Sequence, residues 1–69
     1  MSIEIHAHYE TKGVDGQVLV HVYTEGTAEE LYMNEALLEA VRKRLGRDDV
    51  DYTEEGMQQD GIASLEYWE

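Results

Sequence analysis

The sequence predicts a small two-layer α+β domain, with an antiparallel sheet of three or four strands and one helix packed on one face. Three observations carry this prediction. Two stretches near the N-terminus alternate between apolar and polar residues, a middle stretch repeats apolar residues at helical spacing, and the last stretch is apolar and aromatic. The predicted order is β-β-α-(β)-β, and 69 residues are expected to form a single domain, 1–69.

The first two predicted strands, residues 2–12 and 17–25, are joined by a turn at 13–16. The turn begins and ends with glycine, which adopts positive φ without strain. Strict alternation divides the side chains of each strand between two faces of the sheet. We expect the buried face to receive Ile3, Ile5, Ala7, Tyr9, Val18, Val20 and Val22.

The register of this hairpin is predicted from its apolar faces. Pairing Lys12 with Gln17 makes the apolar sides of the two strands coincide, because Tyr9 then lies opposite Val20. A shift by one residue sets Val20 opposite His8 and mixes the faces. We therefore predict the register in which Lys12 lies opposite Gln17.

A helix is predicted over residues 28–45. Thr27 and Glu30 match a capping box, in which each side chain accepts a hydrogen bond from the other residue's backbone amide. Three basic residues fill the last turn, where they complement the helix dipole, and Gly46 is the expected residue after the helix end. The apolar arc expected to face the core contains Leu31, Leu37, Leu38, Val41 and Leu45.

The stretch from 47 to 61 leaves two alternatives open. Residues 50–53 have the composition of a short strand, whereas Thr53 could instead cap a helical turn. Residues 62–68 are predicted to form the final strand. Its inward face is either Ala63, Leu65 and Tyr67 or the alternate set; the first is favoured because it leaves Ser64 and Glu66 in solvent.

The charge of the chain is the strongest indication of its function. Sixteen acidic residues stand against five basic ones, a net charge of −11, and residues 48–69 contain only acidic charges. Such a field repels nucleic acid and anionic membranes and attracts basic protein surfaces. The residues expected to bind such a partner are the acidic and aromatic ones of this segment: Asp48, Asp49, Asp51, Tyr52, Glu54, Glu55, Asp60, Glu66, Tyr67 and Trp68.

The three histidines suggest a second hypothesis. In the predicted register His6, His8 and His21 share one face of the hairpin, and three imidazoles are a known ligand set for zinc. A metal- or pH-responsive module would use them in this way. The alternative is that they are ordinary residues of an exposed sheet face.

A second apolar strip is expected on the predicted helix, roughly opposite its core arc. Exposed methionine and tyrosine are enriched at protein interfaces, so the strip is a candidate homodimer contact, although ordinary helix formers would give the same pattern. Its residues are Tyr32, Met33, Ala36 and Ala40.

Catalysis is not expected. There is no cysteine, the glycines do not form a phosphate-binding loop, and the acidic stretch around Asp49 and Asp51 lacks the glycine that a calcium loop needs at its sixth position. No signal-peptide pattern or long apolar run is present, which favours a cytoplasmic address, the host cytoplasm if the protein is phage-encoded.

These observations favour a small non-enzymatic protein that blocks or regulates a partner with a basic, nucleic-acid-binding surface. In size and acidity the chain resembles the small inhibitors that phages direct against host defence, including anti-CRISPR proteins and nucleic-acid mimics. The resemblance is one of general character and rests on no motif. The remaining alternative is a structural domain of a salt-adapted organism, in which acidity serves only solvation.

Overall fold

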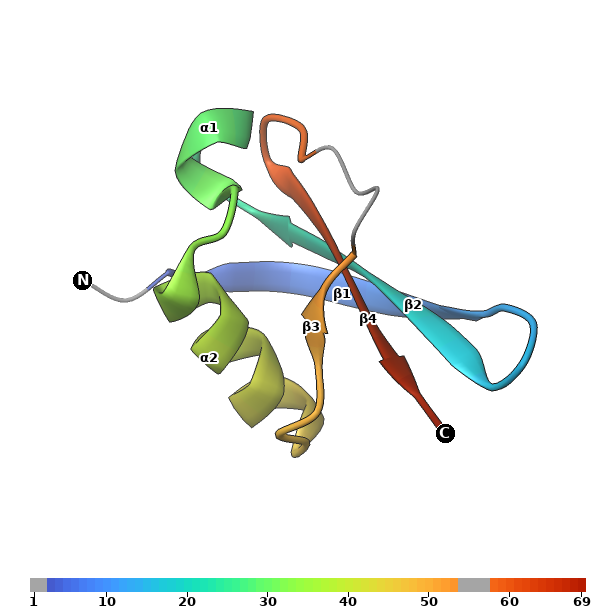
Figure 1. Cartoon of the computed structure of the whole chain (residues 1–69). Coiled ribbons are helices and arrows are strands. Elements are labelled where there is room, and N and C mark those ends of the chain that lie inside the picture. Colours follow the sequence, from blue (N-terminus) through green and yellow to red (C-terminus); the bar gives the residue numbers. More distant parts are fainter. Residues whose placement is uncertain (1–2, 54–57) are drawn as a thin grey trace.

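The computed structural model describes residues 3–53 and 58–69 and shows a small α+β fold (Figure 1). Four strands form one antiparallel sheet in the order β1-β2-β4-β3, and the helices lie together on one side of it. The predicted fold class is confirmed. The elements of the described residues are β1 (Ile5–Lys12), β2 (Gln17–Thr24), α1 (Ala28–Leu31), α2 (Glu35–Leu45), β3 (Asp51–Tyr52) and β4 (Ile62–Trp68).

The core lies between the helices and the two central strands. Alternate side chains of β2 and β4 point into it, the helices cover it, and Val50, just before β3, is buried in it. The inward face predicted for the last strand is confirmed. The buried apolar residues are Val18, Val20, Val22, Leu31, Leu37, Val41, Val50, Ala63, Leu65 and Tyr67.

The prediction of one continuous helix over 28–45 is wrong, because the chain breaks between α1 and α2. Asn34 caps α2 with its side-chain oxygen, which accepts hydrogen bonds from the two amides at Ala36 (2.9 Å) and Leu37 (3.2 Å). Met33, just before it, has a φ of 52°. Asparagine is among the best N-capping residues, so it starts a new helix here instead of continuing the first.

The two outer ends of the helical region are as predicted. Thr27 and Glu30 form the capping box at the start of α1, and Gly46 ends α2 in the left-handed conformation with a φ of 69°. The core face of α2 is centred on Leu37 and Val41. Leu38, which was predicted to be core, lies at the margin of that face and is half-buried.

The predicted hairpin register is wrong for most of its length. A β-bulge between Ile5 and Ala7 adds one residue to β1, so every later pair is displaced by one. Tyr9 therefore lies opposite His21, not opposite Val20. The bulge reverses the alternation of β1: Ile5 still packs against the core, but the helix-covered face beyond it receives His8, Glu10 and Lys12.

The stretch between α2 and β4 contains a short strand at its start. β3 pairs with β4 at Asp51 and Tyr52, within the stretch where a strand was one of the two alternatives. Closer to β4, the side-chain amide of Gln58 accepts from the backbone amide of Ser64 (2.8 Å) and donates to its carbonyl (3.4 Å). Gln58 thereby occupies the open edge of β4 beyond β3. In the described parts of the chain, no helix is both long and apolar enough to cross a membrane.

Candidate interaction surface

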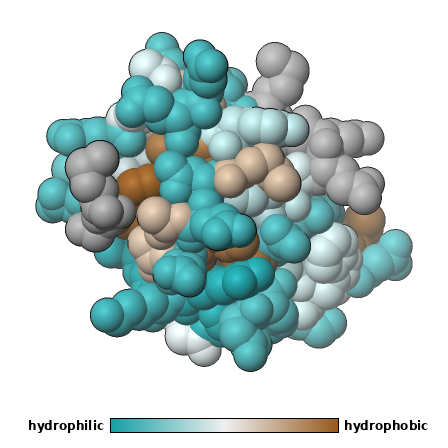
Figure 2. Space-filling model, turned by 60° about the vertical axis from the view of Figure 1, so that its left-hand side comes forward, coloured by the Kyte–Doolittle hydropathy of each residue, from teal (hydrophilic) through white to brown (hydrophobic). Residues whose placement is uncertain are grey.

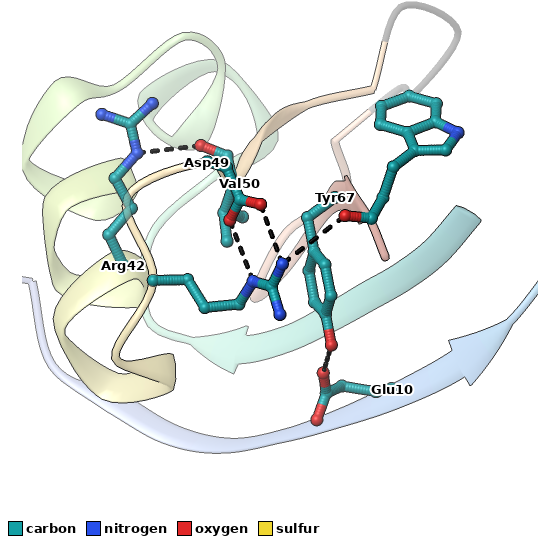
Figure 3. Close-up of polar contacts among 7 residues, drawn as sticks. Glu10, Arg42, Asp49, Val50 and Tyr67 are labelled. Atoms are coloured by element: carbon teal, nitrogen blue, oxygen red, sulfur yellow. Dashed lines mark hydrogen bonds and ion pairs between the residues drawn. The ribbon is translucent and has the colours of Figure 1, made fainter. Parts of the chain in front are cut away.

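Two residues that were predicted to bind a partner, the exposed Asp49 and the buried Tyr67, both contact Arg47 within the fold (Figure 3 labels Asp49 and Tyr67). The Arg47 guanidinium donates two hydrogen bonds to the carboxylate of Asp49, at 2.9 and 2.8 Å, and lies 3.8 Å from the centroid of the Tyr67 ring. These hydrogen bonds lower the pKa of Asp49 and raise that of Arg47. The arrangement fixes the loop between α2 and β3 onto β4.

The hydroxyl end of Tyr67 binds to the first strand. The hydroxyl of Tyr67 donates a hydrogen bond to the carboxylate of Glu10, which the bulge has turned toward the helix side of the sheet. That hydrogen bond, together with burial, raises the pKa of Tyr67. A parallel contact joins α2 to the same strand, since Nε of Arg44 donates to Nδ1 of His8 at 2.7 Å.

Tyr52, another of the three predicted aromatics of the acidic segment, supports the break between the helices. Its hydroxyl accepts from the amide of Asn34 (3.1 Å) and lies within hydrogen-bond distance of the carbonyls of Asn34 (2.7 Å) and Leu31 (3.1 Å). Burial raises the pKa of Tyr52. Its phenol therefore stabilises the fold, and among the aromatics predicted to contact a partner only Trp68 presents an exposed ring.

The acidic residues predicted for the partner site do not form one row. Asp60 accepts a hydrogen bond from the first amide of α1, at Ala28 (2.7 Å), and so serves as an additional cap. Asp48 and Asp51 are exposed, and Glu66 is half-buried with one oxygen accepting from the side-chain amide of Gln17 (2.8 Å). Glu54 and Glu55 lie outside the described residues.

The structure does not bring the three histidines together. His8 lies on the helix-covered face and His21 on the opposite face, because the register that placed them together is displaced. His6 lies next to the bulge, with its Nε2 3.6 Å from a carboxylate oxygen of Glu25. In the described ranges, no group of three or more histidine or acidic side chains is arranged to hold a metal ion.

The strip predicted as a dimer contact is not one face of a helix. Tyr32 and Met33 are 65% and 63% exposed, but they lie in the break between the helices. Ala36 and Ala40 belong to α2 and are half-buried. The helix side of the molecule is mostly hydrophilic, with small apolar areas between the polar groups (Figure 2).

The face of the sheet opposite the helices was not identified from the sequence. We call it the open face; it consists of the outward side chains of the four strands. Its largest members are Tyr9, Tyr23 and Trp68, which are 47%, 40% and 53% exposed. The ring of Tyr9 stacks on His21 with centroids 4.7 Å apart and lies 5.9 Å from the ring of Tyr23. The alternation of residues 17–25 places His21 and Tyr23 on one face, but Tyr9 joins them only because of the bulge.

The open face also carries negative charge. Asp51 and Glu66 lie opposite each other in neighbouring strands, so their side chains are on the same face. Glu66 in turn lies opposite Leu19 of β2, and it is two residues from Trp68 along β4. Among the outward residues of the described strands there is no lysine or arginine.

Four of the five basic residues make contacts within the fold, the exception being the exposed Lys43. Arg42 donates from Nε to the carbonyl of Val50 at 2.9 Å (Figure 3), and Arg44 and Arg47 make the contacts given above. Lys12 lies 4.0 Å from a carboxylate oxygen of Glu69. Their charges are thus tied to positions in the fold, while most of the described carboxylates remain exposed.

Comparison with known proteins gives no assignment: no family model, no curated protein and no solved structure matches the chain significantly.

Proposed function

We propose that this protein is a small acidic, non-enzymatic binding protein that blocks or regulates a partner with a basic surface. The observation that carries the proposal is the imbalance of charge, −11 on 69 residues, combined with the use of all three positions Arg42, Arg44 and Arg47 in internal contacts. A chain that needed acidity only for solubility would require a net charge of about 2–8 in magnitude.

The arrangement of the cations supports this proposal. Two ion pairs join the described residues, Arg47 with Asp49 and Lys12 with Glu69, and the imidazole of His6 lies 3.6 Å from Glu25. Of these, the pair of Arg47 with Asp49 is the closest, at 2.8 Å. The other described carboxylates have no lysine, arginine or histidine nitrogen within 4.0 Å. They therefore contribute an uncompensated negative field, which accelerates encounter with a positive surface.

A nucleic-acid-binding surface is the partner class that fits this field best. Such surfaces are basic because they neutralise phosphates, and exposed carboxylates can occupy the same groove. The general resemblance to small phage inhibitors belongs to the same proposal, as does a cytoplasmic site of action. The protein would act by occupying the surface, with no chemical step.

The proposal is tested by capture of partners from a cell lysate, followed by competition. Tagged protein is used at low and at high salt, and each basic protein recovered is tested for binding of labelled nucleic acid with and without the free acidic protein. The expected result is a basic protein that is retained at low salt, released at high salt and displaced from its nucleic acid. Retention that salt does not change, or a retained protein that still binds nucleic acid fully, would contradict it.

Charge variants locate the effect. One variant carries Asp48→Asn, Asp51→Asn and Glu66→Gln. Its matched control removes three exposed charges from the helical region through Glu29→Gln, Glu35→Gln and Glu39→Gln. Both variants lose the same formal charge, so a general field effect would weaken the binding of the partner equally in the two. The proposal expects the first variant to lose about tenfold more affinity, or 1.4 kcal/mol, than the control.

A further inference from the structure

The open face has the properties of an unoccupied binding surface. The helices cover the other side of the sheet, and the side chains of Tyr9, Tyr23 and Trp68 remain 40% to 53% exposed. Half of the large exposed apolar residues of the described chain lie on this one face; the others are at the helix break, Tyr32 and Met33, and at the hairpin turn, Val14. A concentration of large aromatic side chains on one exposed face is typical of a contact surface.

The aromatic groups are already arranged in the free protein. Tyr9 is held between its neighbours by stacking on His21, at 4.7 Å and an interplanar angle of 20°, and by the tilted ring of Tyr23 at 5.9 Å. Tyr9 and His21 are paired positions of β1 and β2, and Tyr23 lies two residues along β2 from His21 on the same face. Rings fixed in this way lose little conformational freedom on binding, which is why such aromatics often dominate the energy of an interface.

The electrostatics of the face select the occupant. Asp51 and Glu66 supply two neighbouring carboxylates, and the described strands direct no lysine or arginine outward. Trp68 lies two residues from Glu66 on this face, whereas His21, the partner of Tyr9, and Tyr23 itself lie two and four residues along β2 from Leu19, the partner of Glu66. Guanidinium groups stack on aromatic rings and pair with carboxylates, so a segment with several arginines can contact both parts of the face. The chain uses the same combination internally, where Arg47 stacks on Tyr67 while it pairs with Asp49.

We infer that the open face binds an arginine-rich segment of the basic partner, with some guanidinium groups stacked on Tyr9 and Tyr23 and others paired with Asp51 and Glu66. This inference rests on the proposed function and adds the position and chemistry of the contact. The face is a poor match for two other occupants. A second copy would oppose carboxylates to carboxylates, and a nucleic acid would meet a negative surface with no cation to neutralise its phosphates.

The inference is tested with defined peptides. An arginine-rich peptide and a lysine-rich peptide of equal length and charge are titrated into the protein at low salt. Binding is followed by calorimetry, by the fluorescence of Trp68, which is the one tryptophan of the chain, and by NMR of the backbone amides. We expect the arginine peptide to bind about fivefold more tightly than the lysine peptide, with the largest shifts in β1, β2 and β4.

Three identical substitutions provide the control. Tyr9→Thr and Tyr23→Thr each remove one ring from the open face and keep a residue suited to a strand. Tyr32→Thr removes an even more exposed ring from the break between the helices. The first two variants are expected to lose the preference for arginine and about fivefold in affinity each, while the third binds as the parent does. The amide map of the unsubstituted protein decides the matter if a variant fails to fold.

The outcomes separate the inference from the function on which it rests. Equal binding of both peptides, unchanged by Tyr9→Thr and Tyr23→Thr, overturns the assignment of the face but leaves an acidic protein that binds basic partners. Binding of neither peptide at low salt contradicts both proposals. A dimer detected by sedimentation that Tyr9→Thr dissociates would make the face a self-association surface, and tight binding of an oligonucleotide would also overturn the inference.

Discussion

The guanidinium group of Arg47 lies 3.8 Å from the centroid of the Tyr67 ring and pairs with Asp49 on its other side. This relationship joins the loop after α2 to the last strand, and the hydroxyl of Tyr67 extends it to Glu10 on the first strand. Four residues from three distant parts of the sequence thus form one connected set. It explains why Asp49 and Tyr67 belong to the fold, although each resembles a partner-binding residue in the sequence.

The first prediction concerns this connection. Arg47→Lys keeps the charge but removes the planar group that donates two parallel hydrogen bonds and stacks on Tyr67. We expect a thermal midpoint several degrees below that of the parent, whereas Lys43→Ala, at an exposed position of α2, should leave it nearly unchanged. The comparison is made by circular dichroism. A Lys variant as stable as the parent would show that the stacked geometry contributes nothing.

The second prediction distinguishes neighbouring leucines on α2. Leu37 is fully buried, so Leu37→Ala should cost about 2–5 kcal/mol, through lost transfer energy and a cavity. Leu38 is half-buried at the edge of the core, and Leu38→Ala should cost clearly less. Denaturant unfolding of both variants measures the difference. Equal losses would mean that the face of α2 is misplaced.

The third prediction compares two glycines with positive φ. Gly16 has a φ of 82°, and a Cβ added there would lie 2.8 Å from the carbonyl oxygen of Glu69. Gly46 has a φ of 69°, and apart from its chain neighbours no atom lies within 4 Å of the corresponding position. Gly46→Ala should therefore cost only the conformational penalty, about 1 kcal/mol, and Gly16→Ala distinctly more. The same unfolding experiment ranks them, and the reverse order would be inconsistent with the turn geometry.

The fourth prediction concerns alkaline pH. The pKa of Tyr67 is raised by its hydrogen bond to Glu10 and by burial, and that of Tyr52 is raised by burial. The unfolded chain therefore loses these phenolic protons first, so their contribution to stability is complete below pH about 10 and is lost as the pH rises through the folded pKa values.

Unfolding measured against pH checks this sign. Stability should fall above pH about 10, and Tyr67→Phe should reduce the slope of that fall because one shifted group is gone. Glu10→Gln should lower the pKa of Tyr67, as seen in the ultraviolet absorbance of the phenolate. A protein whose stability rises with pH in this range would contradict the account.

Local signals were sufficient for the ends of the helical region and for the last strand. The capping box of Thr27 and Glu30 and the terminal Gly46 depend on residues within one turn of each other, so their spacing can be read directly. The inward face of β4 follows from alternation together with the polarity of Ser64 and Glu66, and Leu65 is fully buried as expected.

The register of the hairpin depended on contacts far apart in the sequence. Alternation favoured an inward Tyr9, but the partners that hold Glu10 and His8 inward are Tyr67 and Arg44, which no local pattern links to the first strand. Polar side chains with good partners are tolerated at the margin of a core, so the apolar match was not decisive. A bulge of a single residue was sufficient to change the face.

The break between the helices had a partial signal in the sequence. Asn34 interrupts an otherwise apolar arc, and its capping preference could have suggested a second start. What secures the break is the hydroxyl of Tyr52 from the neighbouring strand. The candidate surface likewise depended on both local and long-range information. The charge was evident from composition, but the aromatic cluster of the open face could be recognised only once the register of β1 was known.

The most direct test of the central claim is the salt dependence of binding to the arginine-rich peptide. We expect the logarithm of Kd to rise steeply and linearly with the logarithm of salt concentration, mainly through slower association. The variant with Asp48→Asn, Asp51→Asn and Glu66→Gln should show a shallower slope. An affinity that stays constant across salt concentrations, in the parent and the variant alike, would contradict the claim that exposed carboxylates recruit a basic partner.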